Sequence, residues 1–332
     1  MAAHRYGRRR ERGVLVAIGH LLNELRYPTT VRSKVVAASL AALVFSFISL
    51  YTVGGFLLAR ILIPPHSSET IDPTEFLGNA QRVEFQGFDN RTRNGWFFPG
   101  LRGAPVVIIC HGYRSNRQEI LTLGTSLQQH RYNVFAFNFA GHGDSPVGYT
   151  TFGYQESEEL RAVLRMLARR KDVDSNRIGL WGYSLGAYVA LSVAQQSEQV
   201  KALVLDSVYP TPSDLLRLEL ANSGTDFIPL LGKVTLSEFR LLSLLYRDHP
   251  DPRLALDALA GMPKLFVSGD DAPGLATFTQ ELYDAAPGPK ELLPLPRTNM
   301  ASLADVERRS YENQIVGFFL RSLPLVAARV RR

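Results

Sequence analysis

The 332-residue sequence predicts an α/β protein, a mostly parallel sheet flanked by helices, with a helical lid and one N-terminal transmembrane helix. Three observations carry this prediction. Strand-like and helix-like segments alternate between residues 81 and 323. Several of the strand-like segments are continuous apolar runs, which is typical of strands covered on both faces. An uncharged stretch of 25 residues, Val35 to Ala59, precedes them all.

The uncharged stretch is longer than the roughly 20 residues needed to cross a hydrocarbon core. Before it, the chain holds eight arginines and lysines against two glutamates. An excess of positive charge keeps a flanking segment in the cytoplasm. We therefore expect a single-pass membrane protein, with a basic cytoplasmic segment 1–34, a transmembrane helix 35–63 and a linker 64–80. The folded domain should lie outside the cytoplasm, and the preference for arginine over lysine favours a bacterial plasma membrane.

Charge and composition argue against several other classes of partner and cofactor. The net charge of +6 arises before Val35, so the rest of the chain is nearly neutral and nucleic acid is not an expected partner. Cys110 is the only cysteine, which excludes an internal disulfide. No cluster of histidine, cysteine and carboxylate residues has metal-ligand spacing, and no G-x-G-x-x-G follows a strand. We expect no metal and no cofactor.

The elements of the soluble domain, residues 81–323, follow from their periodicity. A hairpin is predicted over 82–98, because two alternating segments flank the turn "DNRTRN". Further strands are predicted over 105–112, 132–139, 177–182, 201–207, 264–269 and 290–296. Helices are predicted over 116–130, 154–170, 185–196, 275–286 and 304–323. The alternation breaks over about 208–261, which holds its own helical patterns and is interpreted as the lid. A basic tail, 324–332, follows the last helix.

A serine stands between a predicted strand and a predicted helix, in "GYSLG", residues 182–186. This G-x-S-x-G pattern places a serine in a strained turn, so the positions two before and two after it must be small. The start of the helix directs backbone N–H groups at a developing negative charge. The alternative interpretation is a serine that merely caps the helix.

A second segment, "CHGYRSN", follows an earlier strand at the same edge of the sheet. Gly112 allows a sharp turn that leaves the backbone N–H of Tyr113 free to face a substrate. Together with the N–H of Leu185, it would form a two-donor oxyanion hole, which is typically worth several kcal/mol in acyl transfer.

With these residues in view, the segment from about residue 81 to 323 resembles the α/β-hydrolase superfamily. The motifs "HGYRSN", "GHGDS", "TFGYQESEEL", "GYSLGAYVAL", "ALVLDS" and "KLFVSGDD" follow the order and spacing of its serine aminopeptidase and prolyl-oligopeptidase-like esterase group. The resemblance implies that Ser184 is the nucleophile and that Tyr113 and Leu185 are the oxyanion donors. It implies Asp271 as the acid, with Asp270 as the first alternative and Asp206 as the second.

The sequence departs from this family at the base. The resemblance calls for a histidine in the loop 294–303, where Asn299 or Met300 stands instead, and no histidine follows His249. Asparagine cannot take the proton of a serine, and loss of the base in serine proteases costs about a million-fold in turnover. His249, in the lid, is the candidate for a relocated base. His111 and His142, which follow two other strands, are weaker candidates.

Two functions therefore remain open. The chain is either a membrane-anchored serine hydrolase of ester or amide substrates, or a catalytically inactive pseudo-hydrolase that serves as a membrane-tethered binding or scaffolding module. Family resemblance favours the hydrolase, and the missing histidine leaves its activity uncertain. The apolar lid suits a small-molecule or lipid-like acyl substrate.

Overall fold

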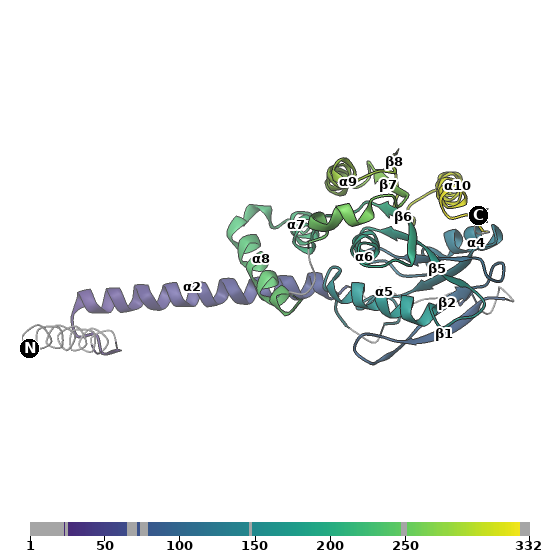
Figure 1. The fold of residues 1–332 in the computed structure, drawn as a ribbon. Coiled ribbons are helices and arrows are strands. Elements are labelled where there is room, and N and C mark those ends of the chain that lie inside the picture. Colours follow the sequence, from purple (N-terminus) through teal and green to yellow (C-terminus); the bar gives the residue numbers. More distant parts are fainter. Residues whose placement is uncertain are drawn as a thin grey trace, which may run out of the picture.

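The computed structural model describes residues 23, 26–64, 72–73, 79–145, 148–246 and 251–325. A single eight-stranded sheet in the order β1-β2-β4-β3-β5-β6-β7-β8 forms the centre of the domain (Figure 1). Its strands are β1 (Gln81–Gln86), β2 (Thr92–Phe98), β3 (Pro105–Cys110), β4 (Asn133–Phe137), β5 (Asp174–Tyr183), β6 (Val200–Asp206), β7 (Lys264–Gly269) and β8 (Lys290–Leu295). The β1–β2 and β2–β4 pairs are antiparallel and the other pairs are parallel. The predicted fold class is confirmed.

Helices cover both faces of this sheet. Those of the domain body are α4 (Leu121–Gln129), α5 (Tyr154–Leu167), α6 (Leu185–Ala194), α9 (Pro273–Ala285) and α10 (Asp305–Ser322). Apolar side chains of α5, α6 and α9 belong to one core cluster, and those of α4 and α10 belong to the other. The central strand β3 is buried along its whole length, which explains its unbroken apolar sequence. The parallel strands end at one edge of the sheet, and the loops at that edge carry the predicted site.

The N-terminal helix α2 (Val31–Leu62) extends from the domain as a rod (Figure 1). It begins at Thr30, whose side chain caps it. It is long and apolar enough to cross a membrane, and its most apolar 18-residue stretch is entirely unburied. Its last turn is different, because Leu58, Ile61 and Leu62 join the core of the domain.

The lid region contains two helices with different neighbours. Its elements are α7 (Pro212–Asn222), the 3-10 turn η1 (Thr225–Phe227), α8 (Pro229–Ser243), and the 3-10 segments η2 (Leu244–Tyr246) and η3 (Pro252–Leu259). Helix α7 packs at the C-terminal edge of the sheet, whereas α8 crosses beside α2 (Figure 1). Residues 247–250, which include His249, lie outside the described residues.

Candidate active site

Ser184 lies in the sharp turn that joins β5 to α6. Its φ of 49° and ψ of −108° fall in a region that residues other than glycine rarely adopt. The turn is held in place because the Ser184 N–H donates to the carbonyl of Asp206 on the neighbouring strand, at 2.9 Å. The hydroxyl does not cap the helix. The side chain is therefore presented at the strand end without a role in stabilising α6.

The glycines on either side of the serine allow this turn. A Cβ at Gly182 would lie 2.2 Å from the carbonyl oxygen of Gly186. A Cβ at Gly186 would lie 2.0 Å from the carbonyl oxygen of Cys110, at the end of β3. The start of α6 therefore packs directly on the end of β3. This contact brings the turn that holds Ser184 close to the end of the strand that precedes Tyr113.

A cavity of about 430 Å³ is lined by Ser184 and by loops from four strand ends. Its other lining residues include Tyr113, Ser115, Glu119, Tyr183, Leu215, Leu218, Glu219, Asp271, Leu275 and Asn299. A larger depression of about 590 Å³ lies beside Lys201 and Pro263, where β6 and β7 begin, and so at the opposite edge of the sheet. Only the first cavity combines the strained serine with acidic side chains.

Asp271 faces the loop that follows β8. Its carboxylate accepts the backbone N–H of Thr298 at 3.2 Å and that of Asn299 at 3.3 Å. Asp270 makes a backbone hydrogen bond to Leu295 and does not line the cavity. The carboxylate that points toward the predicted base position is therefore that of Asp271.

Asn299 occupies the position beside this acid. It lines the same cavity as Ser184 and Asp271, where its side chain has neither the basicity nor the proton of an imidazole. Among the residues that the structure describes, no histidine lines the cavity. The structure thus brings a serine and an acid to one cavity, which Asn299 lines from the loop after β8.

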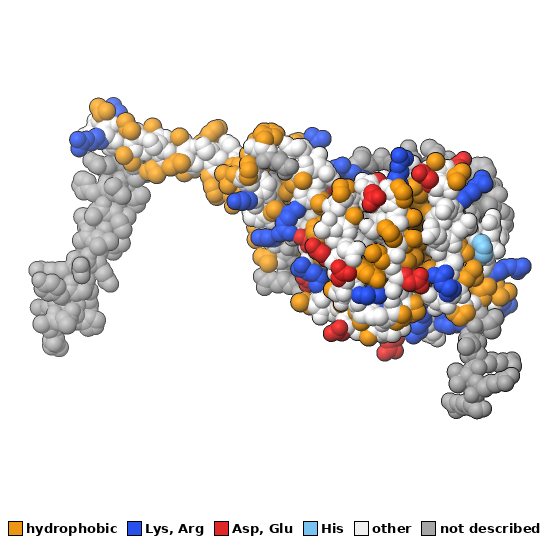
Figure 2. Space-filling model, turned by 90° about the horizontal axis from the view of Figure 1, so that it is seen from above, with side chains coloured by type: hydrophobic (Ala, Val, Ile, Leu, Met, Phe, Trp, Pro, Cys, Tyr) orange, Lys and Arg blue, Asp and Glu red, His pale blue; other side chains and the backbone are white. Residues whose placement is uncertain are grey.

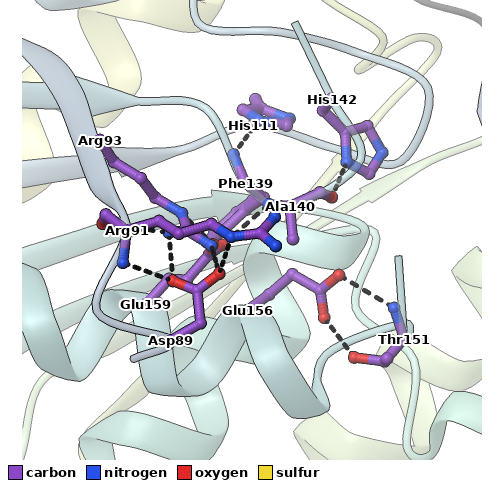
Figure 3. Close-up of polar contacts among 10 residues, drawn as sticks. All are labelled: Asp89, Arg91, Arg93, His111, Phe139, Ala140, His142, Thr151, Glu156 and Glu159. Carbon is purple, nitrogen blue, oxygen red and sulfur yellow. Dashed lines mark hydrogen bonds and ion pairs between the residues drawn. The ribbon is translucent and has the colours of Figure 1, made fainter. Parts of the chain in front are cut away.

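His111 and His142 are buried, and their rings lie 5.2 Å apart between centroids (Figure 3). His111 Nδ1 donates to the carbonyl of Gly112, and its Nε2 accepts the N–H of Phe139 at 3.0 Å. Both ring nitrogens are therefore engaged. His142 Nδ1 donates to the carbonyl of Ala140, and burial lowers the pKa of both imidazoles. Each of these two histidines is therefore hydrogen-bonded to the backbone of the loops at this edge of the sheet.

Two buried glutamates of α5 support the same loop from below (Figure 3). Glu159 accepts the N–H of Ala140 and pairs with Arg93 at 2.6 Å. Glu156 accepts hydrogen bonds from the hydroxyl and the N–H of Thr151. These two glutamates of the motif "TFGYQESEEL" therefore accept hydrogen bonds from backbone N–H groups of the loop, which explains their presence in it.

Asp206 is buried at the end of β6, behind the nucleophile. Tyr311 donates to its Oδ2 at 2.6 Å and in turn accepts the indole N–H of Trp181 at 3.0 Å. Ser207 donates to its Oδ1 at 2.9 Å. Burial raises the pKa of Asp206 to about 7, although these hydrogen bonds oppose the shift. Asp206 does not line the cavity, so it is not placed to act as the acid of this site.

This buried carboxyl should make stability depend on pH. Its pKa is higher in the folded than in the unfolded protein. Its contribution to the free energy of unfolding is therefore complete below about pH 4 and is lost as the pH rises through about 7. We expect Asp206→Asn to remove this loss, which is on the order of 4 kcal/mol. Thermal unfolding of both proteins from pH 4 to pH 8 measures the difference. Parallel pH profiles for the two proteins would contradict the prediction.

Two acidic side chains of the cavity were not predicted from the sequence. Glu119 and Glu219 line it, and burial raises the pKa of each carboxyl. Arg114 lies 3.8 Å from Glu219. The sequence of α7 contains a pattern that could have predicted this wall of the cavity. Four of its residues follow the i, i+3, i+4, i+7 spacing of one helix face, namely Leu215, Leu218, Glu219 and Asn222.

Known proteins share the fold of this chain. A family model described as "alpha/beta hydrolase fold" matches residues 105–283. The uncharacterized protein YfhR of Escherichia coli O157:H7 is 25% identical over 253 residues, which cover 74% of this chain and 82% of that protein. The uncharacterized protein Rv2307c of Mycobacterium tuberculosis is 28% identical over 242 residues, which cover 71% and 78%.

A solved structure shares the fold at lower sequence identity. The esterase Pf2001 of Pyrococcus furiosus superposes with a TM-score of 0.60 and 21% identity, over 80% of this chain and 98% of that one. At this identity the likeness establishes the arrangement of strands and helices.

Proposed function

Because the chain belongs to the α/β-hydrolase family, we propose that it is a membrane-anchored hydrolase of ester or amide substrates, with Ser184 as the nucleophile. The observation that carries the proposal is the strained backbone of Ser184, with φ at 49°. Such strain persists only where the surrounding structure enforces it, and it clusters at reactive sites. Helix α2 anchors the protein, with its basic end in the cytoplasm and the domain outside.

In the proposed reaction the Ser184 oxygen bonds to the carbonyl carbon of the substrate. The backbone N–H groups of Tyr113 and Leu185 stabilise the oxyanion that forms. The bond to the leaving alcohol or amine then breaks, and the leaving group takes the proton that serine gave up. Water attacks the acyl-serine, returns a proton to the serine oxygen and releases the carboxylic acid. Asp271 orients the group that carries the proton, for which His249 is the candidate.

The second candidate function is a membrane-tethered binding or scaffolding module. The observation that favours it is Asn299, which fills the position beside Asp271. A protein of this kind would keep the cavity as a binding site and lose the chemistry.

Labelling of the full chain with a fluorophosphonate probe separates these two functions. We expect the wild type to react, Ser184→Ala to be inert and His249→Ala to react at least 10-fold more slowly. Labelling that requires Ser184 but is insensitive to His249→Ala would retain the hydrolase and remove His249 as its base. A folded wild type that stays unlabelled at high probe concentration would overturn the hydrolase in favour of the binding module.

A further inference from the structure

Helix α8 is fixed against the apolar helix α2. The Thr235 hydroxyl lies 3.4 Å from the carbonyl oxygen of Gly54, and a Cβ at Gly54 would lie 3.0 Å from a methyl group of Val234. The missing side chain at Gly54 therefore lets the two helices approach closely. This contact holds the lid region to α2.

The contact lies at a defined depth along α2. Lys34 is the last charge before the apolar stretch, and a hydrocarbon core of about 30 Å at 1.5 Å per residue takes roughly 20 residues. Counted from Val35, such a core ends near Gly54. If α2 spans the membrane, α8 crosses it at the level where the outer hydrocarbon meets the lipid headgroups.

The segment around α8 exposes large apolar side chains at this level. Phe227, Leu230, Leu241 and Leu245 are 81%, 59%, 69% and 77% exposed, and Phe56 of α2 is 67% exposed. Hydrophobic side chains also run along α2 to the point where it meets the rounded domain (Figure 2). Apolar surface that continues from a membrane helix onto a neighbouring helix is expected to contact lipid.

The same segment is directly connected to the candidate active site. Helix α7 supplies Leu215, Leu218 and Glu219 to the cavity wall, and only six residues separate its end from α8. Tyr113, also at the cavity, donates its hydroxyl to the carbonyl of Ile61 on α2 at 2.5 Å. The cavity therefore lies between the sheet edge and α7, and one of its lining side chains contacts the end of α2.

We propose that residues 227–245 lie in the outer interface of the membrane that α2 spans, and that the cavity takes its substrate, an acyl lipid, from that bilayer. The substrate class rests on the proposed hydrolase function, whereas the membrane contact does not. The exposed Lys233 and Arg240 of α8 would face anionic headgroups.

Depth measurement by spin labelling tests the membrane contact. Cys110 is fully buried, so a nitroxide can be attached selectively to Leu230→Cys, to Leu245→Cys and to the control Val306→Cys, which is 81% exposed on α10. The full chain is placed in phosphatidylcholine–phosphatidylglycerol vesicles. We expect labels at 230 and 245 to collide more often with oxygen than with an aqueous nickel chelate, and the label at 306 to show the reverse. Labels at 230 and 245 that are as accessible to nickel as the label at 306 would overturn the membrane contact.

A pair of substrates tests the acyl lipid separately. Leu230→Glu combined with Leu245→Glu should lower hydrolysis of a phospholipid in the vesicles at least 10-fold and leave hydrolysis of water-soluble p-nitrophenyl acetate unchanged. The control Val306→Glu should change neither. Equal effects on both substrates, or on neither, would overturn the lipid substrate. If the depth result holds while Ser184 stays unlabelled by the fluorophosphonate, the hydrolase fails and the membrane contact stands.

Discussion

In the His249→Ala background, Asn299→His is expected to raise the rate of fluorophosphonate labelling and of ester hydrolysis by about 10²–10⁴, the usual contribution of a positioned general base. Asn299 lines the cavity with Ser184, and its backbone already donates to the Asp271 carboxylate. An imidazole there would have an acid to orient it and a hydroxyl to deprotonate. Single-turnover labelling of the full chain in detergent measures the gain.

Two further variants show whether the gain comes from a rebuilt triad. Asp271→Asn in the Asn299→His background should remove most of the increase, because the imidazole then loses the carboxylate that orients it. Ser184→Ala should abolish labelling in both backgrounds. If the His249→Ala protein with Asn299→His folds normally and reacts no faster than His249→Ala alone, the assignment of Asn299 to the base position is refuted.

Gly186→Ala is expected to destabilise the protein by at least about 3 kcal/mol, and the folded yield should be largely lost. The added Cβ would lie 2.0 Å from the carbonyl oxygen of Cys110 and 2.7 Å from that of His111. Both are backbone atoms of the central strand or its end, so neither can rotate away. Thermal unfolding and the yield of monodisperse protein measure the loss.

Gly232→Ala provides a matched control in the same chain. Gly232 lies in α8, and a Cβ there meets nothing within 4 Å. Alanine is preferred over glycine in a helix by up to about 1 kcal/mol, so this variant should be as stable as the wild type or slightly more stable. A similar loss in both variants would mean that the tight packing at Gly186 is not the cause.

The sequence was sufficient to predict the sheet, because its signals are local. Strand β3 is apolar at every position and Ser184 has glycine two residues away on each side, so both could be identified without the structure. The α/β-hydrolase superfamily is confirmed by the family match over residues 105–283. The apolar stretch forms one helix, as predicted, and its crossing of a membrane stays a proposal.

Contacts between distant segments could not be predicted in the same way. Nothing in the local sequence pattern of α8 shows that it packs on α2. The two residues of the Thr235–Gly54 contact are 181 positions apart in the sequence. The Tyr311–Asp206 hydrogen bond likewise joins residues 105 positions apart. The relation of Asp271 to Asn299 could be anticipated from family order alone, because it depends on two loops that meet only in the folded sheet.

The hydrogen bond from Tyr113 to Ile61 has a practical consequence for anyone who studies this protein. A soluble fragment that begins after the end of α2 at Leu62 would remove Leu58, Ile61 and Leu62 from the core and would take away the carbonyl that the Tyr113 hydroxyl donates to. The backbone of that same tyrosine is the proposed oxyanion donor. Low activity in such a fragment would then reflect a displaced Tyr113 rather than a site that lacks activity in the full chain. By these contacts, the end of α2 is part of the folded domain.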